Sequence, residues 1–100
     1  MKRPYAGRKS IATAYSPECL YEDGASFATQ QIELHAPESN TSVIYIGDRS
    51  VCARADYEVG LPLDPGDRFT LVTVDLADWF LDVRTDGDAV SYLVIYDDEG

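Results

Sequence analysis

The residues with the most obvious chemical potential are aspartates in the last fifth of the chain. Asp82, Asp86 and Asp88 lie close together, and Asp97-Asp98-Glu99 follow near the C-terminus. Carboxylates suit Ca²⁺, which takes about six to eight oxygen ligands, but the sequence contains neither an EF-hand loop nor a DxDxDG pattern. Because aspartate also favours turns, we interpret these residues as turn formers and solubilising groups. We predict no metal site and no cofactor.

A catalytic site based on a nucleophile has few candidates. His35, the single histidine, would have to act with Cys19, Cys52 or a serine. Such chemistry needs a base placed beside the nucleophile, and nothing in the sequence places these residues together. A structural zinc site commonly needs about four His or Cys ligands, more than this chain holds. A Cys19–Cys52 disulfide is geometrically possible, but we favour two buried free thiols. We expect a protein that is not an enzyme.

The charges are unevenly distributed along the chain. Net charge is −10, yet Lys2, Arg3, Arg8 and Lys9 give residues 1–9 a charge of +4, which leaves −14 for residues 10–100. An acidic body repels phosphate backbones, so nucleic acid is not expected as the main partner. The basic segment could contact a nucleic acid or an acidic protein surface, or it could simply be solvated.

The first residues are interpreted as an arm. Residues 1–10 show no apolar periodicity, and residues 10–15 alternate loosely and could add a strand to this fold or to a neighbour. The segment contains Tyr5 and Tyr15 among the 7 tyrosines of the chain. Tyrosine is enriched at protein interfaces, so an arm with these tyrosines and four basic residues is a candidate binding element. We predict an extended arm over residues 1–15 and one domain over residues 16–100. The arm residues proposed to bind a partner are Lys2, Arg3, Tyr5, Arg8, Lys9 and Tyr15.

The rest of the chain has the period and turn residues of short strands. Apolar residues alternate with polar ones over 29–35, and further strands are expected over 43–46, 51–53, 61–63, 69–74, 79–84 and 89–96. Asp64-Pro65-Gly66-Asp67 fits a type II turn, and one short helical turn is expected over 75–78. The chain is therefore all-β, with about seven or eight short antiparallel strands that must close as a sandwich or barrel.

Asp86-Gly87 predicts a β-hairpin, because a type I′ turn needs positive φ at both central residues. The register then places Val83 opposite Val90, Leu81 opposite Tyr92 and Trp79 opposite Val94. Residues 69–96 would form an antiparallel meander. The other face of the hairpin becomes apolar at three residues, which we predict as an oligomer interface: Phe80, Leu93 and Ile95.

The order of turns and strands resembles that of small all-β virion proteins of tailed bacteriophages, which include capsid decoration (cement) proteins and related head or tail fibre modules. The likeness covers about two thirds of the chain, and residues 1–15 have no counterpart in it. The residues that carry it are Ala36-Pro37, Ser39-Asn40-Thr41, Val43–Gly47, Leu61–Asp67, Phe69–Leu71, Asp75-Leu76, Trp79 and Asp86–Tyr92.

The resemblance implies a jelly-roll-like β-sandwich that assembles as a homotrimer on the outside of a phage head. Its partner would be the major capsid protein, and the trimer would stabilise the shell by bridging capsomers. No apolar run approaches the roughly 20 residues of a membrane span, and the basic N-terminus lacks the apolar part of a signal peptide. We therefore expect no membrane partner, and assembly in the host cytoplasm. A carbohydrate- or receptor-binding module and a head–tail connector or tail component are the alternatives.

Overall fold

The computed structural model describes residues 2–21, 28–72 and 74–97, which form eight β-strands and one short 3₁₀ helix. The all-β class is confirmed. Of the acidic residues near the C-terminus, Asp98 and Glu99 lie outside the described residues. The described residues include no helix long and apolar enough to cross a membrane. The elements are β1 (Lys2–Ser10), β2 (Glu18–Cys19), β3 (Gln31–His35), β4 (Ile44–Gly47), β5 (Leu61–Leu63), β6 (Arg68–Val72), η1 (Leu76–Asp78), β7 (Phe80–Val83) and β8 (Ala89–Asp97).

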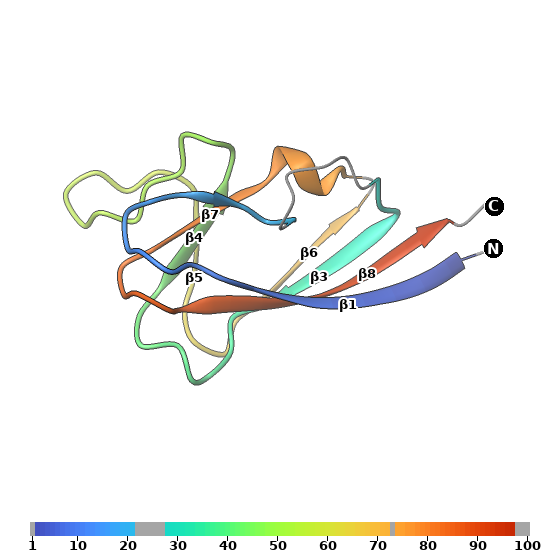
Figure 1. The fold of residues 1–100 in the computed structure, drawn as a ribbon, viewed down its shortest axis with the longest axis horizontal. Coiled ribbons are helices and arrows are strands. Elements are labelled where there is room, and N and C mark those ends of the chain that lie inside the picture. The colour runs from blue at the N-terminus through green and yellow to red at the C-terminus, as the bar shows by residue number, and fades with distance from the viewer. Residues whose placement is uncertain (1, 22–27, 73, 98–100) are drawn as a thin grey trace.

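The strands form two four-stranded antiparallel sheets, with the orders β1-β8-β3-β6 and β2-β7-β4-β5. Pairing is nested along the chain, since β1 pairs with β8, β2 with β7, β3 with β6 and β4 with β5. Strands β1 and β8 run side by side, and both termini lie at the same end of the molecule (Figure 1). The predicted two-sheet sandwich is therefore present.

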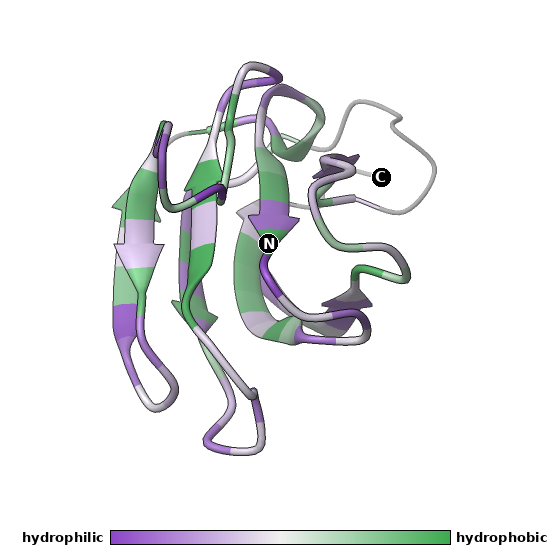
Figure 2. Cartoon of the chain, turned by 90° about the vertical axis from the view of Figure 1, so that its left-hand side faces the viewer, coloured by the Kyte–Doolittle hydropathy of each residue, from purple (hydrophilic) through white to green (hydrophobic). Residues whose placement is uncertain are grey.

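The core lies between the two sheets and is built by alternation along the strands. In β3, Ile32 and Leu34 are buried while their neighbours are not, as expected for a strand with one solvated face. Hydrophobic bands lie on the strands and hydrophilic stretches are common in the loops (Figure 2). The branched aliphatic side chains that the other central strands bury in this core are Ile44, Ile46, Leu81, Val83, Val90 and Val94.

The predicted hairpin at Asp86-Gly87 is wrong, although the turn itself is present. Gly87 has φ +87°, and the Asp88 N–H donates to the Thr85 carbonyl at 3.2 Å. The chain then crosses from one sheet to the other, because β7 pairs with β2 and β4 whereas β8 pairs with β1 and β3. The expected meander is also wrong for this reason. The pairs Val83–Val90, Leu81–Tyr92 and Trp79–Val94 do not form, since the two strands belong to opposite sheets.

Contacts with a distant loop explain this crossing. The Gly87 N–H donates to the Ile11 carbonyl at 2.8 Å, and the Asp86 carboxylate accepts from the Ala14 N–H at 2.7 Å. The turn is thus bonded to residues 11–14 instead of holding two strands side by side. In opposite sheets, the apolar side chains of β7 and β8 can both contribute to one core.

Two smaller predictions have different outcomes. The turn at Asp64–Asp67 is confirmed, with Gly66 at φ +95° and a 2.8 Å hydrogen bond from the Asp67 N–H to the Asp64 carbonyl. Residues 51–53 were expected to pair with the preceding strand, but Cys52 instead makes an isolated bridge with Val59. Strand β5 takes that place beside β4, and residues 48–60 form a loop over the sheet.

Candidate protein-binding surface

The basic N-terminal segment is an edge strand of the sandwich. Strand β1 runs along β8 from Lys2 opposite Asp97 to Ser10 opposite Ala89, and the next residue, Ile11, is fully buried. Residues 2–11, expected as an arm apart from the domain, are therefore part of it. The physical reason is that β3 pairs with one side of β8, whose other side would otherwise leave its backbone groups unpaired.

A tyrosine ring lying across β1 supports this pairing. Tyr92 of β8 lies opposite Gly7, and a Cβ at Gly7 would come within 2.5 Å of the Tyr92 ring. Tyr5 contacts the same ring with a centroid separation of 6.3 Å. Glycine at position 7 thus leaves the space that the Tyr92 ring occupies, an arrangement known to stabilise sheet edges.

The outer face of the β1-β8-β3-β6 sheet is defined by the side chains that alternate with the core residues. The registers of the three strand pairs align these side chains in three rows across the sheet. Reading from β1 to β6, the rows are Pro4–Ile95–Gln31–Val72, Ala6–Leu93–Glu33–Thr70 and Arg8–Ser91–His35–Arg68.

One row of the outer face carries basic residues on three of its four strands, with Ser91 on the fourth. Arg8 and His35 both lie opposite Ser91, and Arg68 lies opposite His35. Arg68 forms a 3.0 Å ion pair with Glu33, but both side chains are largely exposed, so the pair contributes little to stability. Within the described residues, no carboxylate pairs with Arg8. We call these four residues the basic row.

An apolar patch borders the basic row. Leu93, which is 48% exposed, lies in the row next to the basic row. Ile95, partly exposed, and Val72, 66% exposed, lie in the row beyond it, with Gln31 between them. A shallow depression of about 190 Å³ lies where the patch meets the basic row, lined by Glu33, His35, Ser91, Tyr92 and Leu93. Exposed apolar side chains beside aligned charges are typical of a protein-binding surface.

The three residues predicted as one oligomer interface lie on two different sheets. Leu93 and Ile95 are on the outer face, but Phe80 belongs to β7 in the other sheet. Phe80 packs against the buried cluster that includes Tyr45 and Val51, and the Arg49 guanidinium lies 5.6 Å from its ring centroid. The prediction that these three residues share one face was wrong because it assumed that β7 and β8 pair with each other, and they do not.

The three aspartates considered as metal ligands instead bind backbone amides of three different segments. The carboxylate of Asp82 accepts from the Ala53 N–H at 2.8 Å. Asp88 accepts from the N–H groups of Thr41 and Ser42 at 2.9 and 3.1 Å, and Asp86 binds the loop at residue 14. Each aspartate thus fastens a loop. The described residues include no group of three or more His, Cys, Asp or Glu side chains that could hold a metal ion.

A polar cluster braces loop 48–60 against the second sheet. Tyr45 and Arg84 both donate to the Glu58 carboxylate, and the Arg84 Nε donates to the Ala53 carbonyl at 2.7 Å. Burial and the hydrogen bond to Glu58 raise the pKa of Tyr45. The same hydrogen bond and the charge of Arg84 lower the pKa of Glu58. The cluster is fully formed at pH values between these two pKa values. It weakens when the pH falls through the lowered pKa of Glu58, because the carboxylate is then protonated, and when the pH rises through the raised pKa of Tyr45, because the phenol then loses its proton.

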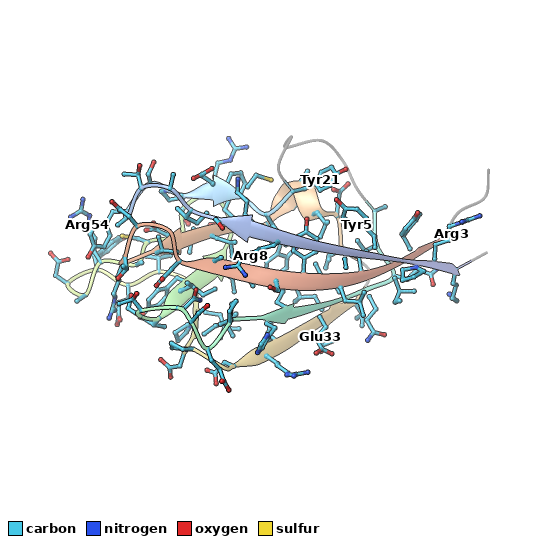
Figure 3. All side chains as sticks on the ribbon, turned by 60° about the horizontal axis from the view of Figure 1, so that its bottom comes forward. Arg3, Tyr5, Arg8, Tyr21, Glu33 and Arg54 are labelled. Atoms are coloured by element: carbon cyan, nitrogen blue, oxygen red, sulfur yellow. The ribbon has the colours of Figure 1, made fainter. Side chains whose placement is uncertain are left out.

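Tyr15, one of the residues assigned to the arm, belongs to the opposite end of the molecule from Arg3. It has φ +62°, and the Arg54 guanidinium lies 4.7 Å from its ring centroid. Figure 3 shows Arg54 and Arg3 at opposite ends of the molecule. Tyr57, on the same loop as Arg54, is 70% exposed. Tyr15 and the basic residues of β1 therefore do not form one continuous surface.

The remaining basic residues of β1 differ in their contacts. Lys9 points toward β2 and forms a 3.0 Å ion pair with Glu18, in which the lysine side chain is largely buried. Lys2 donates to the Gln30 side chain. Arg3 is exposed at the end of the strand, and Arg8 lies on the outer face (Figure 3). Of the predicted arm residues, Arg8 is the one that joins the basic row.

A second depression of about 280 Å³ lies at the end of the other sheet and is lined by Gly47, Asp48, Asp78 and Trp79. Asp78 and Trp79 come from η1 and its C-cap, and Asp48 from the turn after β4. Hydrogen bonds from Ser50 lower the pKa of Asp48, so this carboxylate is ionised at neutral pH. The depression offers hydrogen-bond acceptors beside an aromatic residue.

His35, Arg68 and Val72 are residues of the outer face that sequence reasoning did not identify as binding candidates. Their signal is the strand register, because His35 lies opposite both Ser91 and Arg68. His35 and Ser91 are partners in the β3–β8 pairing, but no side-chain hydrogen bond within the described residues joins His35 to a serine or cysteine. Comparison with protein-family models, curated protein sequences and solved structures found no match for this chain.

Proposed function

We propose that this protein is a non-enzymatic structural protein of a bacteriophage particle, a capsid decoration protein that docks through the outer face of the β1-β8-β3-β6 sheet. The observation that carries the proposal is the juxtaposition on this face of the basic row with Leu93, which is exposed in the neighbouring row. Apolar burial would supply affinity, and the aligned charges would set orientation.

The strand connectivity supports this reading. Nested pairs from β1–β8 inward to β4–β5 are what results when one long antiparallel hairpin is wrapped into two sheets. We interpret this connectivity as a jelly roll, an architecture common in viral capsid proteins and also in lectins. The connectivity supports a virion protein by analogy of fold, while the surface chemistry supports a binding role.

The distribution of charge supports docking in one orientation. Residues 1–9 carry +4 against −14 for the remainder, and β1 forms one edge of the docking sheet. An acidic surface on the major capsid protein would attract this edge and repel the rest of the molecule. Three copies around a symmetry axis would bind the shell with higher avidity than one, because each contact raises the effective concentration of the next.

The proposal is tested by quantitative peptide mass spectrometry of purified particles from the phage or lysogen that carries this sequence. A copy number comparable with that of the major capsid protein is expected for a protein that covers the shell. A few copies per particle would indicate a connector or tail component. Absence from particles would overturn the proposal.

Replacing Leu93 with aspartate is expected to weaken binding to undecorated particles by about tenfold or more, since interface hot spots cost about 2 kcal/mol or more when lost. Leu93 is exposed, so the melting temperature should change little. Leu61→Asp is the matched control, because Leu61 is 42% exposed on the other sheet. Co-sedimentation with particles measures both variants. Equal binding by the two would show that the outer face is not the docking surface.

The depression at Trp79 favours a second candidate, a saccharide-binding module. Carboxylates accept hydrogen bonds from sugar hydroxyls, and an aromatic residue offers an apolar surface. Trp79 is the single tryptophan, so its fluorescence reports directly on this depression. A glycan array followed by fluorescence titration should show saturable binding that Asp78→Ala weakens about tenfold and Asp56→Ala, a change at an exposed site, leaves unchanged. A blank array with folded protein would exclude this function.

A further inference from the structure

Strand β1 has one edge that pairs with no strand of the described chain. It is the first strand in the order β1-β8-β3-β6, and its nine residues make it the longest of the four edge strands, the others being β6, β2 and β5 with five, two and three residues. Soluble proteins keep edge strands short or otherwise protect them, because an open row of N–H and C=O groups pairs readily with another chain. A long open edge therefore marks β1 as a place for intermolecular pairing.

The hydrogen bonds around β1 show which of its backbone groups face the open edge. The Ile11 N–H donates to the Asp88 carbonyl at 3.0 Å, and the Ile11 carbonyl accepts from Gly87 at 2.8 Å. Bonding direction alternates along an antiparallel strand, so the odd-numbered residues of β1 face β8 and the even-numbered ones face outward. On β8, the Ile95 carbonyl accepts from the Gln30 N–H on the β3 side, which agrees with this assignment.

The position of Pro4 agrees with this alternation of backbone groups. It is even-numbered, so the N–H that proline lacks would have pointed to the open edge, and no bond with β8 is lost. The N–H groups of Ala6, Arg8 and Ser10 then remain as donors on that edge. The row of open N–H donors is therefore uninterrupted over the second half of β1, which leads to the buried Ile11.

The charges of β1 decide what kind of strand can pair there. A second copy of β1 in antiparallel pairing would bring basic residues against basic residues, since the segment holds four and no acid. Like charges directly opposite in a sheet are destabilising, and opposite charges stabilise. The outward-facing Arg8 has no carboxylate partner within the described residues. A partner strand should therefore be acidic.

From this edge we propose that β1 accepts an acidic, extended segment of another protein as a fifth strand of the β1-β8-β3-β6 sheet. The backbone groups of Ala6, Arg8 and Ser10 would bind the main chain of the segment, and the outward-facing Arg8 side chain would select acidic residues. This recognition mode takes most of its affinity from main-chain hydrogen bonds. It does not depend on the capsid assignment, because any acidic extended segment satisfies it.

Amide hydrogen exchange measured by NMR on the full chain tests the inference. In the free protein, the amides of Ala6, Arg8 and Ser10 should exchange faster than those of Tyr5, Gly7 and Lys9. An end-blocked peptide of alternating Glu and Val, at millimolar concentration, should slow the three even-numbered amides by about tenfold or more. The corresponding Lys-Val peptide should leave their exchange unchanged. If the acidic peptide shifts the Leu93 and His35 signals without slowing these amides, it binds the outer face and the inference is wrong; absence of any effect also overturns it.

Two variants sharpen the test. Ala6→Pro removes one open-edge donor, while its exposed position leaves room for the ring, and it should abolish the peptide effect that Ala6→Thr retains. If Ala6→Pro fails to fold, Arg8→Glu leaves the backbone intact and should abolish protection by the acidic peptide. Protection that survives Arg8→Glu would contradict charge selection. Absence of strand addition to the unmodified chain, together with normal particle binding, would overturn this inference and leave the proposed function standing.

Discussion

Replacing Asp82 with alanine is expected to lower the free energy of unfolding by about 2–4 kcal/mol, because it leaves buried donors without an acceptor. Asp82 is 1% exposed, and its carboxylate accepts from the Ala53 N–H at 2.8 Å and from the Val83 N–H at 2.9 Å. Ala53 is itself fully buried, so water does not replace the lost bond without opening the loop. The melting temperature should fall by about 10 °C or more for a domain of this size.

Two controls separate the buried carboxylate from other effects. Asp82→Asn keeps one acceptor oxygen and should lose less stability than the alanine variant. Asp56→Ala removes an exposed aspartate from loop 48–60 and should change stability by less than about 0.5 kcal/mol. Chemical denaturation with a single transition measures all three variants. If Asp82→Ala were no less stable than Asp56→Ala, the carboxylate would not be what holds this loop.

Comparing variants of Asp82 and Leu93 distinguishes an effect on stability from an effect on docking. It lies on the sheet opposite the outer face, and loop 48–60, which it fastens, belongs to that other sheet. Asp82→Ala should therefore bind particles normally at temperatures where it remains folded, whereas Leu93→Asp should melt normally and bind poorly. Opposite results for the two variants would indicate that loop 48–60, with its exposed Tyr57, is the docking element.

The positions of several strands could be predicted because their signals are local. Gln31–His35 alternates between buried and solvated positions within five residues, and that period needs no knowledge of a partner. The turn at Gly66 is likewise specified by neighbouring residues, since proline sets one φ and glycine permits the next. Prediction succeeded where the determining residues are adjacent in sequence.

Strand pairing could not be predicted in the same way. Asp86-Gly87 is compatible with a turn whether the next strand returns in the same sheet or crosses to the other. The choice is made by Ile11 and Ala14, which bind the turn from more than 70 residues away. For the same reason β1 was not predicted as a strand of the sandwich. Its apolar pattern is weak, and its place in the sheet depends on the side of β8 that does not pair with β3. Non-local partners overrode a strong local preference.

The candidate site was predictable only in part. Arg8 was identified from its charge, and Leu93 and Ile95 from the alternation of side chains along one strand, both of which are local properties. The basic row is a property of register, since Arg8, Ser91, His35 and Arg68 come from four strands and meet only when the strand pairs are known. Sequence reasoning therefore identified some residues of the surface but not how they are arranged on it.

The contacts that set this topology make Asn40→Ala a destabilising change, with an expected loss of about 2–4 kcal/mol. The Asn40 side chain donates to the Ala89 carbonyl at 2.8 Å and accepts from the Ala89 N–H at 2.9 Å. Both residues are buried, so alanine leaves a donor and an acceptor of the first β8 residue unpaired. Asn40 thereby joins loop 36–43 to the point where the chain enters β8.

Ser39→Ala is the matched control, because Ser39 is the exposed neighbour of Asn40, and it should change stability by less than about 0.5 kcal/mol. Denaturant unfolding measures the loss, and amide exchange locates it: the Ala89 N–H should lose protection in Asn40→Ala before the rest of β8 does. Asp88 still binds Thr41 and Ser42 in this variant, so the loop stays attached while the Ala89 bonds are absent. Unchanged protection at Ala89 would mean that pairing with β1, and not Asn40, holds the start of β8 in the sheet.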